Sequence, residues 1–149
     1  MNTIEMEVKS GDSGFEAVDE NGHILHTDTS VENGGLNYGF RPMQLLLPAL
    51  GSCSGIDVVS ILKKQRQTIE HFKIKIEGER EPDKIPSLWK KIQVSFELHG
   101  NIEVEKAKRA VSLSIEKYCS VAETLRRGGT EITWKVKVIN SDPVKGHNY

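Results

Sequence analysis

The segment that decides the fold covers residues 41–59 and reads RPMQLLLPALGSCSGIDVV. Its apolar character continues to Leu62 without the polar outer face that a surface helix shows. Pro42 suits a first helical turn because its missing N–H would be unpaired there, and Pro48 is expected to kink or tighten that turn. We therefore predict a buried central helix from Pro42, with a patch of small residues at 51–55 where another backbone could approach closely.

Strands and shorter helices are predicted on both sides of this helix. Alternation of apolar and polar residues indicates strands, and the Asn21–Gly22 pair favours a hairpin turn. Helical spacing indicates a second helix, and Ser120 opens a capping-box pattern that predicts a short third one. The expected elements are strands at 4–9, 23–26, 72–77, 92–98 and 132–138, helices at 104–118 and 120–125, a glycine-rich loop at 32–39, a proline-containing loop at 82–86 and a loose polar tail at 142–149.

This order of elements predicts an α+β fold, with the helices packed on a largely antiparallel sheet. We expect residues 1–149 to form a single domain, since this length matches one compact core. A central helix that is apolar all round needs cover on all sides. One sheet and one further helix are too small to supply it, so we expect a homodimer.

Composition excludes several classes of protein. The chain has 149 residues, of which 20 are Lys or Arg and 21 are Asp or Glu, so the net charge of −1 argues against nucleic-acid binding by bulk charge. We find no apolar run approaching the 18 to 20 residues of a typical membrane span, and residues 1–10 lack the apolar core of a signal peptide. We therefore expect a cytoplasmic protein without a membrane partner.

The two cysteine thiols are the candidate reactive groups of the sequence. Cys53 lies among small residues in the central helix, and Cys119 ends the second helix, 66 positions later. Each could be a small buried hydrophobic residue. Alternatively, Cys53 could attack a peroxide and Cys119 could resolve the resulting sulfenic acid as a disulfide, which would require a cation near the attacking thiolate. The spacing alone does not bring the two residues together.

Other chemistries lack their motifs. The sequence has no Cys-x-x-Cys, no His-Glu-x-x-His, no Walker loop, no G-x-G-x-x-G and no G-x-S-x-G elbow. Its five histidines fall at element edges, in the tail, or in one predicted strand where His23 and His26 should face opposite ways. We expect no metal and no cofactor.

Residues 41–59, together with Tyr118-Cys119-Ser120-Val121, resemble the signature segments of the OsmC/Ohr family, named for osmotically inducible protein C and organic hydroperoxide resistance. The resemblance covers nearly the whole chain. It implies an intertwined homodimer with a largely antiparallel sheet wrapped around buried central helices. It also implies reduction of small organic hydroperoxides in oxidative stress defence, with Cys53 peroxidatic, Cys119 resolving and a dithiol as reductant.

The family pattern also has an arginine from the N-terminal hairpin and a glutamate directly after the helix-opening proline. Here that position is Met43, no arginine precedes Arg41, and Gln44 carries an amide in place of a carboxylate. Arg41 and Gln44 are the candidate supporting residues. Asp57, one helical turn after Cys53, would disfavour a thiolate unless another group pairs with it. The chain thus resembles a less characterised branch of the family.

Three hypotheses remain open at this point. The first is a hydroperoxide reductase whose apolar substrate pocket is lined by Phe40, Met43, Leu46 and Leu47. The second is a dimer that binds a hydrophobic small molecule and keeps the fold without efficient thiol catalysis. The third is a structural stress-response dimer with neither ligand nor turnover.

Overall fold

The computed structural model describes residues 1–141. The chain forms two compact units, Met1–Leu46 and Leu47–Tyr149. Each unit is described by itself, and the expectation of a single domain over residues 1–149 stays a prediction. The predicted tail at 142–149 lies outside the described residues.

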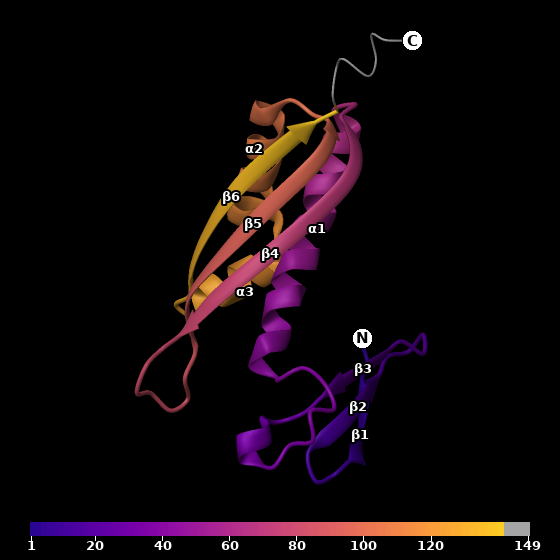
Figure 1. The fold of residues 1–149 in the computed structure, drawn as a ribbon, viewed down its shortest axis with the longest axis vertical. Coiled ribbons are helices and arrows are strands. Elements are labelled where there is room, and N and C mark those ends of the chain that lie inside the picture. The colour runs from indigo at the N-terminus through magenta and orange to yellow at the C-terminus, as the bar shows by residue number, and fades with distance from the viewer. Residues whose placement is uncertain (142–149) are drawn as a thin grey trace. The chain divides into compact units, whose positions relative to one another are not determined.

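The N-terminal unit is an antiparallel meander of three strands, of which the sequence predicted those near 4–9 and 23–26 (Figure 1). The strands are β1 (Glu5–Ser10), β2 (Gly14–Val18) and β3 (Ile24–Thr27), paired in the order β1-β2-β3. Gly22 takes a φ of +83° in the predicted turn before β3, a backbone conformation that favours glycine. The glycine-rich loop that follows contains a short 3₁₀ turn, η1 (Val31–Asn33).

One buried carboxylate organises the loop after β3. Asp28 is only 2% exposed. Its oxygens accept hydrogen bonds from the Ser13 hydroxyl at 2.7 Å and from the backbone N–H groups of Thr29, Leu36 and Tyr38 at 2.8, 2.9 and 3.1 Å. The Ser13 hydrogen bond, with help from these backbone donors, lowers the pKa of Asp28 to about 2. The loop is therefore closed around an ionised side chain.

The central helix begins later than the sequence predicts. Pro42 precedes a 3₁₀ turn, η2 (Met43–Leu45), and the regular helix α1 covers Leu46–Lys64. Pro48 sits in the first turn of α1, where a missing N–H costs little. The predicted tightening of this turn is thus present as the 3₁₀ segment.

The C-terminal unit contains a second three-stranded sheet in the order β4-β5-β6, so the fold has two sheets where the sequence suggested one. Its strands are β4 (Thr68–Arg80), β5 (Trp89–Asn101) and β6 (Glu131–Asn140). The β4–β5 pair is antiparallel, but β5 and β6 are parallel. Parallel pairing needs a long crossover, which α2 (Val104–Leu113), a π-helical turn η3 (Ser114–Tyr118) and α3 (Ser120–Arg127) supply. In Figure 1 the helices of this unit lie on one face of its sheet.

The small residues of α1 allow the helix to pack closely on β4, although the close contacts are with isoleucine side chains and not with another backbone as the sequence suggested. A Cβ atom added at Gly51 would fall 2.5 Å from the Cδ1 atom of Ile76, and one added at Gly55 would fall 2.9 Å from the Cδ1 atom of Ile74. Between helices and sheet lies an apolar core that includes the fully buried Leu50, Val58, Leu62, Ile92, Val94, Phe96, Leu98, Val111 and Ile115.

The other face of α1 is open in the single chain, and the predicted burial of this face by a second copy stays a prediction. Ile56 is 69% exposed and Val59 is 40% exposed. The prediction that no segment could span a membrane is wrong on length and composition, because the 22 residues Met43–Lys64 have a mean hydropathy of 1.8 over their most apolar window. Gly51 and Gly55 pack closely on β4, as residues of a core helix do. A core helix can have the same length and mean hydropathy as a membrane-spanning helix.

Candidate active site

The two cysteines occupy different kinds of position in the C-terminal unit. Cys53 is a half-buried residue in the middle of α1. Cys119 is the N-cap of α3, with an extended backbone (φ −74°, ψ 108°), and its sulfur accepts a hydrogen bond from the N–H of Ala122 at 3.4 Å. The sequence predicted Ser120 as this cap. Ser120 is instead the first helical residue, and the thiol takes the capping role.

The fold brings Cys53 and Cys119 together. The Cys53 thiol lies near enough to Cys119 to contribute to raising the pKa of that residue, and both are free thiols. Nothing in the 66-residue separation indicates this contact. It arises because the turn between α2 and α3 packs against the segment of α1 that carries Cys53.

The environments of the two thiols differ. Cys119 is 2% exposed, and burial raises its pKa to about 11, against the opposing effect of the Ala122 N–H and with a smaller raising contribution from neighbouring Cys53. At neutral pH Cys119 is therefore a protonated thiol. Cys53 is the more accessible of the pair.

A buried polar cluster lies beside Cys53, and sequence reasoning missed it. The hydroxyl of Ser114, a fully buried residue, lies 2.8 Å from the Oδ2 atom of Asp57 and 3.3 Å from the carbonyl oxygen of Ser54. Asp57 thus has a neutral hydroxyl as its partner. The signal that could have revealed the cluster is an isolated polar residue, Ser114, on the apolar side of the second helix.

The candidate supporting residues lie together in the N-terminal unit. The Nη1 atom of Arg41 donates to the carbonyl oxygen of Gly39 at 2.9 Å, and its backbone N–H donates to the Oε1 atom of Gln44 at 3.2 Å. A hollow of about 480 Å³ is lined by Asn37, Gly39, Phe40, Arg41 and Gln44. Of the predicted substrate-pocket residues, Phe40 lines this hollow, whereas Met43, Leu46 and Leu47 are half-buried and do not.

An apolar hollow of about 360 Å³ lies between α1 and β4, beside the exposed Ile56 and Val59, and the sequence assigned no ligand to it. It lies over the small-residue patch, which leaves room where larger side chains would fill it. Its lining residues are Gly51, Ser52, Gly55, Ile56, Val59, Phe72 and Ile74.

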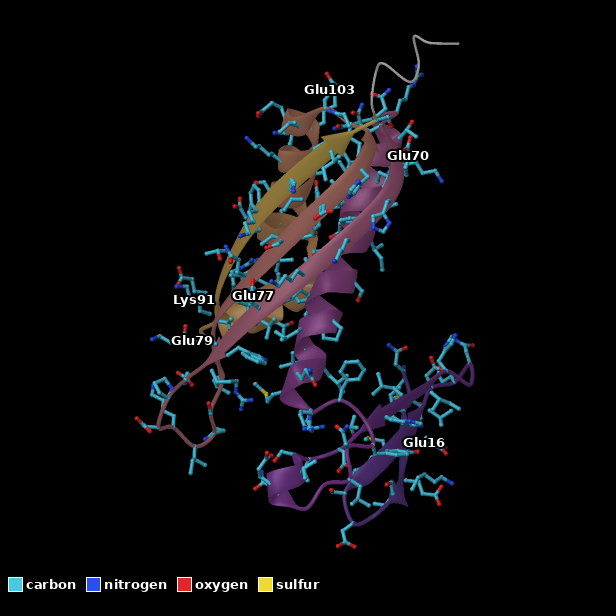
Figure 2. The ribbon with its side chains drawn as sticks, in the orientation of Figure 1. Glu16, Glu70, Glu77, Glu79, Lys91 and Glu103 are labelled. Atoms are coloured by element: carbon cyan, nitrogen blue, oxygen red, sulfur yellow. The ribbon has the colours of Figure 1, made fainter. Side chains whose placement is uncertain are left out.

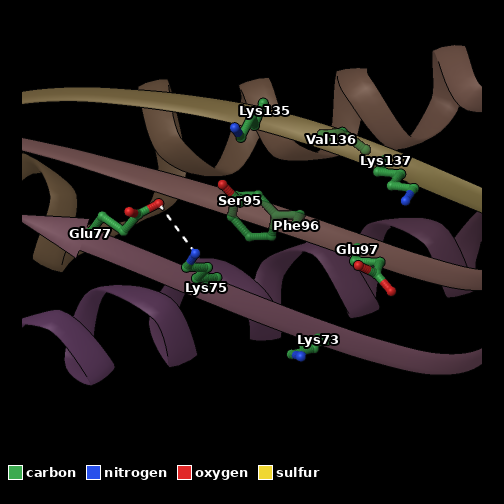
Figure 3. Close-up of a pocket in the computed structure, with 9 residues that line it drawn as sticks. All are labelled: Lys73, Lys75, Glu77, Ser95, Phe96, Glu97, Lys135, Val136 and Lys137. Atoms are coloured by element: carbon green, nitrogen blue, oxygen red, sulfur yellow. Dashed lines mark ion pairs between the residues drawn. The ribbon is translucent and has the colours of Figure 1, made fainter.

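The opposite face of the C-terminal sheet is charged. Figure 2 shows Glu77, Glu79 and Lys91 projecting from β4 and β5. A hollow of about 420 Å³ on this face is shown in Figure 3, where a dashed line joins Lys75 and Glu77, 3.9 Å apart. Such alternating charges are typical of the solvated face of a sheet. Within residues 1–141 no group of three or more His, Cys, Asp or Glu residues is placed to hold a metal ion.

Comparison with known proteins identifies the family. A family model described as OsmC-like protein matches residues 33–135. The chain belongs to the OsmC-like family. Protein YhfA of Escherichia coli K12 is 41% identical to this OsmC-like chain over 99 residues, which are 66% of this chain and 72% of YhfA.

Solved structures agree with this assignment. A hypothetical protein from Aquifex aeolicus is 35% identical and superposes with a TM-score of 0.76 over 93% of this chain and 98% of that one. An organic hydroperoxide resistance protein OsmC from Legionella pneumophila superposes with a TM-score of 0.68 over 93% and 97% of the two chains, at 18% identity. The second likeness shows the fold alone. The predicted α+β class and the OsmC-like resemblance are both confirmed.

Proposed function

We propose that this OsmC-like protein is a thiol-dependent peroxidase that reduces organic hydroperoxides, with Cys53 as the peroxidatic and Cys119 as the resolving cysteine. The observation that carries the proposal is that the fold makes the two thiols neighbours, so that Cys53 contributes to the raised pKa of Cys119. Two buried structural cysteines would not need to meet, and their contact favours a redox pair over two isolated hydrophobic residues.

The difference in environment supports the proposed order of the two thiols. Cys53, as the thiolate, attacks the terminal oxygen of the hydroperoxide, so that an S–O bond forms, the O–O bond breaks and the alcohol leaves after taking up a proton. Cys119 then attacks the sulfenic sulfur, an S–S bond forms, and the hydroxyl leaves with the Cys119 proton as water. A dithiol reductant restores both thiols. Burial and the raised pKa of Cys119 make it the less suitable of the two thiols for the first attack.

The departures from the family pattern predict slow turnover. An efficient peroxidatic thiolate needs a nearby cation. In the family pattern that cation is an arginine held by a glutamate. In this chain the glutamate position is Met43, which cannot pair with a cation. Arg41, the cation that the sequence offers in place of the family arginine, lies in the N-terminal unit. Its guanidinium donates to the neutral Gly39 carbonyl, and Gln44 accepts from its backbone N–H.

We further propose that the protein acts as a cytoplasmic homodimer in which a second copy covers the open face of α1. The exposed side chains of Ile56 and Val59 and the apolar hollow beside them support this. Sedimentation of the wild type and of Ile56→Glu tests the assembly. The wild type should sediment as a dimer and the variant as a monomer, whereas a monomeric wild type contradicts the proposal.

The peroxidase activity is tested by adding one equivalent of cumene hydroperoxide to the reduced protein, followed by thiol counting and intact-mass analysis. We expect the wild type to lose both thiols and 2 Da, and Cys119→Ser to accumulate an oxidised Cys53. Cys53→Ser should keep its remaining thiol. Free thiols in the treated wild type would contradict the proposal.

The apolar hollow on α1 favours a second candidate function, the binding of a hydrophobic small molecule without efficient thiol chemistry. Every side chain that lines the hollow is apolar except Ser52. Native mass spectrometry of protein purified from cells would then show a bound apolar ligand, which Gly55→Leu should displace. A consistently empty protein would count against this function.

A further inference from the structure

We propose that Ser114 is a positioning residue that holds the two thiols in register for disulfide closure. The inference rests on the proposed function, since it concerns the step that joins Cys53 to Cys119. It assigns no contact with substrate to Ser114.

The first observation is that the backbone of Ser114 fixes Cys119. The N–H of Cys119 donates to the carbonyl oxygen of Ser114 at 2.7 Å, five residues earlier in the chain. This is the bond of a π-helical turn, and such turns often occur at functional sites. The additional residue in the turn shifts the chain out of α-helical register, which places Cys119 at the cap of α3 and against α1.

The π-helical turn leaves one carbonyl without its usual helical partner, and α3 supplies the donor. In an α-helix the N–H of Cys119 would donate to the carbonyl of Ile115. Here the guanidinium Nη1 atom of Arg126 donates to that carbonyl oxygen instead. The irregular turn is therefore satisfied from within the unit, and the position of Cys119 is fixed.

The second observation is that the side chain of Ser114 fixes α1 around Cys53. Its hydroxyl donates to Asp57, at 2.8 Å, with the carbonyl oxygen of Ser54 at 3.3 Å. Ser54 directly follows Cys53, and Asp57 lies one turn later. Because Ser114 is fully buried, removing its hydroxyl leaves the carboxylate of Asp57 without this donor and frees α1 from the turn that holds Cys119.

The consequence is specific to the second chemical step. Oxidation of Cys53 needs only access of the oxidant to that thiol. Closure of the disulfide needs the sulfur of Cys119 to meet the sulfur of Cys53 at bonding distance, and it is sensitive to small displacements of either backbone. Loss of the Ser114 hydroxyl should slow closure about tenfold and leave the first step unchanged.

Rapid-quench mass spectrometry of Ser114→Ala tests this. After addition of cumene hydroperoxide, trapping by dimedone should show Cys53 sulfenic acid forming at the wild-type rate, while the disulfide appears about tenfold more slowly. Ser114→Thr, which keeps the hydroxyl, should restore closure. The control is Ser112→Ala, two residues earlier, whose exposed hydroxyl bonds only Glu116. Equal closure rates in Ser114→Ala and wild type, or equal slowing in Ser112→Ala, would overturn the proposal.

Two further arms protect the test. Asp57→Ala removes the same hydrogen bond by changing its α1 partner, and it should slow disulfide closure to a similar extent. This variant therefore tests the proposal if Ser114→Ala does not fold. Diamide oxidises a dithiol to a disulfide as its N=N bond is reduced to a hydrazine, without any peroxidase activity. Suppose that hydroperoxide leaves the wild type unchanged, but diamide forms the disulfide faster in the wild type than in Ser114→Ala. The peroxidase function then fails and the role of Ser114 stands. Equal closure by diamide overturns the role of Ser114.

Discussion

The two compact units of the chain are each stabilised by a different kind of interaction. In the N-terminal unit the buried residues are small or polar, with Ala17, Thr27 and Asp28 among them, and the loop after β3 is fixed by the hydrogen bonds of Asp28. Many large apolar side chains of that unit are exposed, including Ile4, Met6, Val8, Phe15, Ile24, Leu25, Val31, Leu36 and Phe40. In the C-terminal unit, by contrast, large apolar side chains fill a core between helices and sheet.

This difference shows which unit depends on a further surface. A three-stranded sheet needs a buried apolar face to be stable, and the meander β1–β3 does not bury one within its own unit. Its exposed apolar residues are therefore not surplus. They leave apolar surface that the proposed second copy would cover, whereas the C-terminal unit has its own core.

The largest expected effect comes from the core of the C-terminal unit. Phe96 is 1% exposed and stacks on Phe72, so Phe96→Ala should lower the free energy of unfolding by about 3–5 kcal/mol. Urea denaturation measures this. Phe40→Ala in the N-terminal unit is the matched control, and its 49% exposure predicts a loss of less than about 1 kcal/mol. Equal losses would show that Phe40 is buried in an assembly.

The same contrast explains what the sequence could predict. Alternation and helical spacing located the strands and helices, and the small patch at 51–55 indicated the close approach that Gly51 and Gly55 make to β4. These are local signals. The parallel pairing of β6 and the contact of Cys53 with Cys119 depend on how distant segments pack, and no local pattern encodes either. The cap at Cys119 was misplaced by one residue because serine is the commoner capping residue.

The second prediction concerns the tight contact of α1 with β4. A Cβ atom at Gly55 would lie 2.9 Å from the Cδ1 atom of Ile74, so Gly55→Val should overpack the contact and lower the free energy of unfolding by about 1–3 kcal/mol. Ser60→Val, at an exposed position of the same helix, controls for helix propensity and should change stability by less than about 0.5 kcal/mol. A neutral Gly55→Val would mean that β4 can move away from the helix.

The third prediction separates the two units. Asp28→Asn replaces an acceptor of four hydrogen bonds with a group that has only one acceptor oxygen, so the loop after β3 should loosen. Hydrogen exchange should accelerate about tenfold or more at the N–H groups of Leu36 and Tyr38. The amides of β4–β6 should exchange at wild-type rates. Acceleration throughout both sheets would show that the two units unfold as one and would break the comparison.

The smallest effect is the pH dependence of the stability of that same loop. Near neutral pH this stability does not change with pH. The folded pKa of Asp28, about 2, lies below its ordinary value, so its ionised form stabilises the folded loop. This stabilisation is fully present above the unfolded pKa, about 3.9, and is lost as the pH falls through about 2. Amide chemical shifts of Leu36 and Tyr38 should therefore titrate near pH 2 in the wild type and stay flat in Asp28→Asn. A wild-type midpoint near 3.9 would mean that these N–H groups do not hold the carboxylate, and the polar centre of the N-terminal unit would have to lie elsewhere.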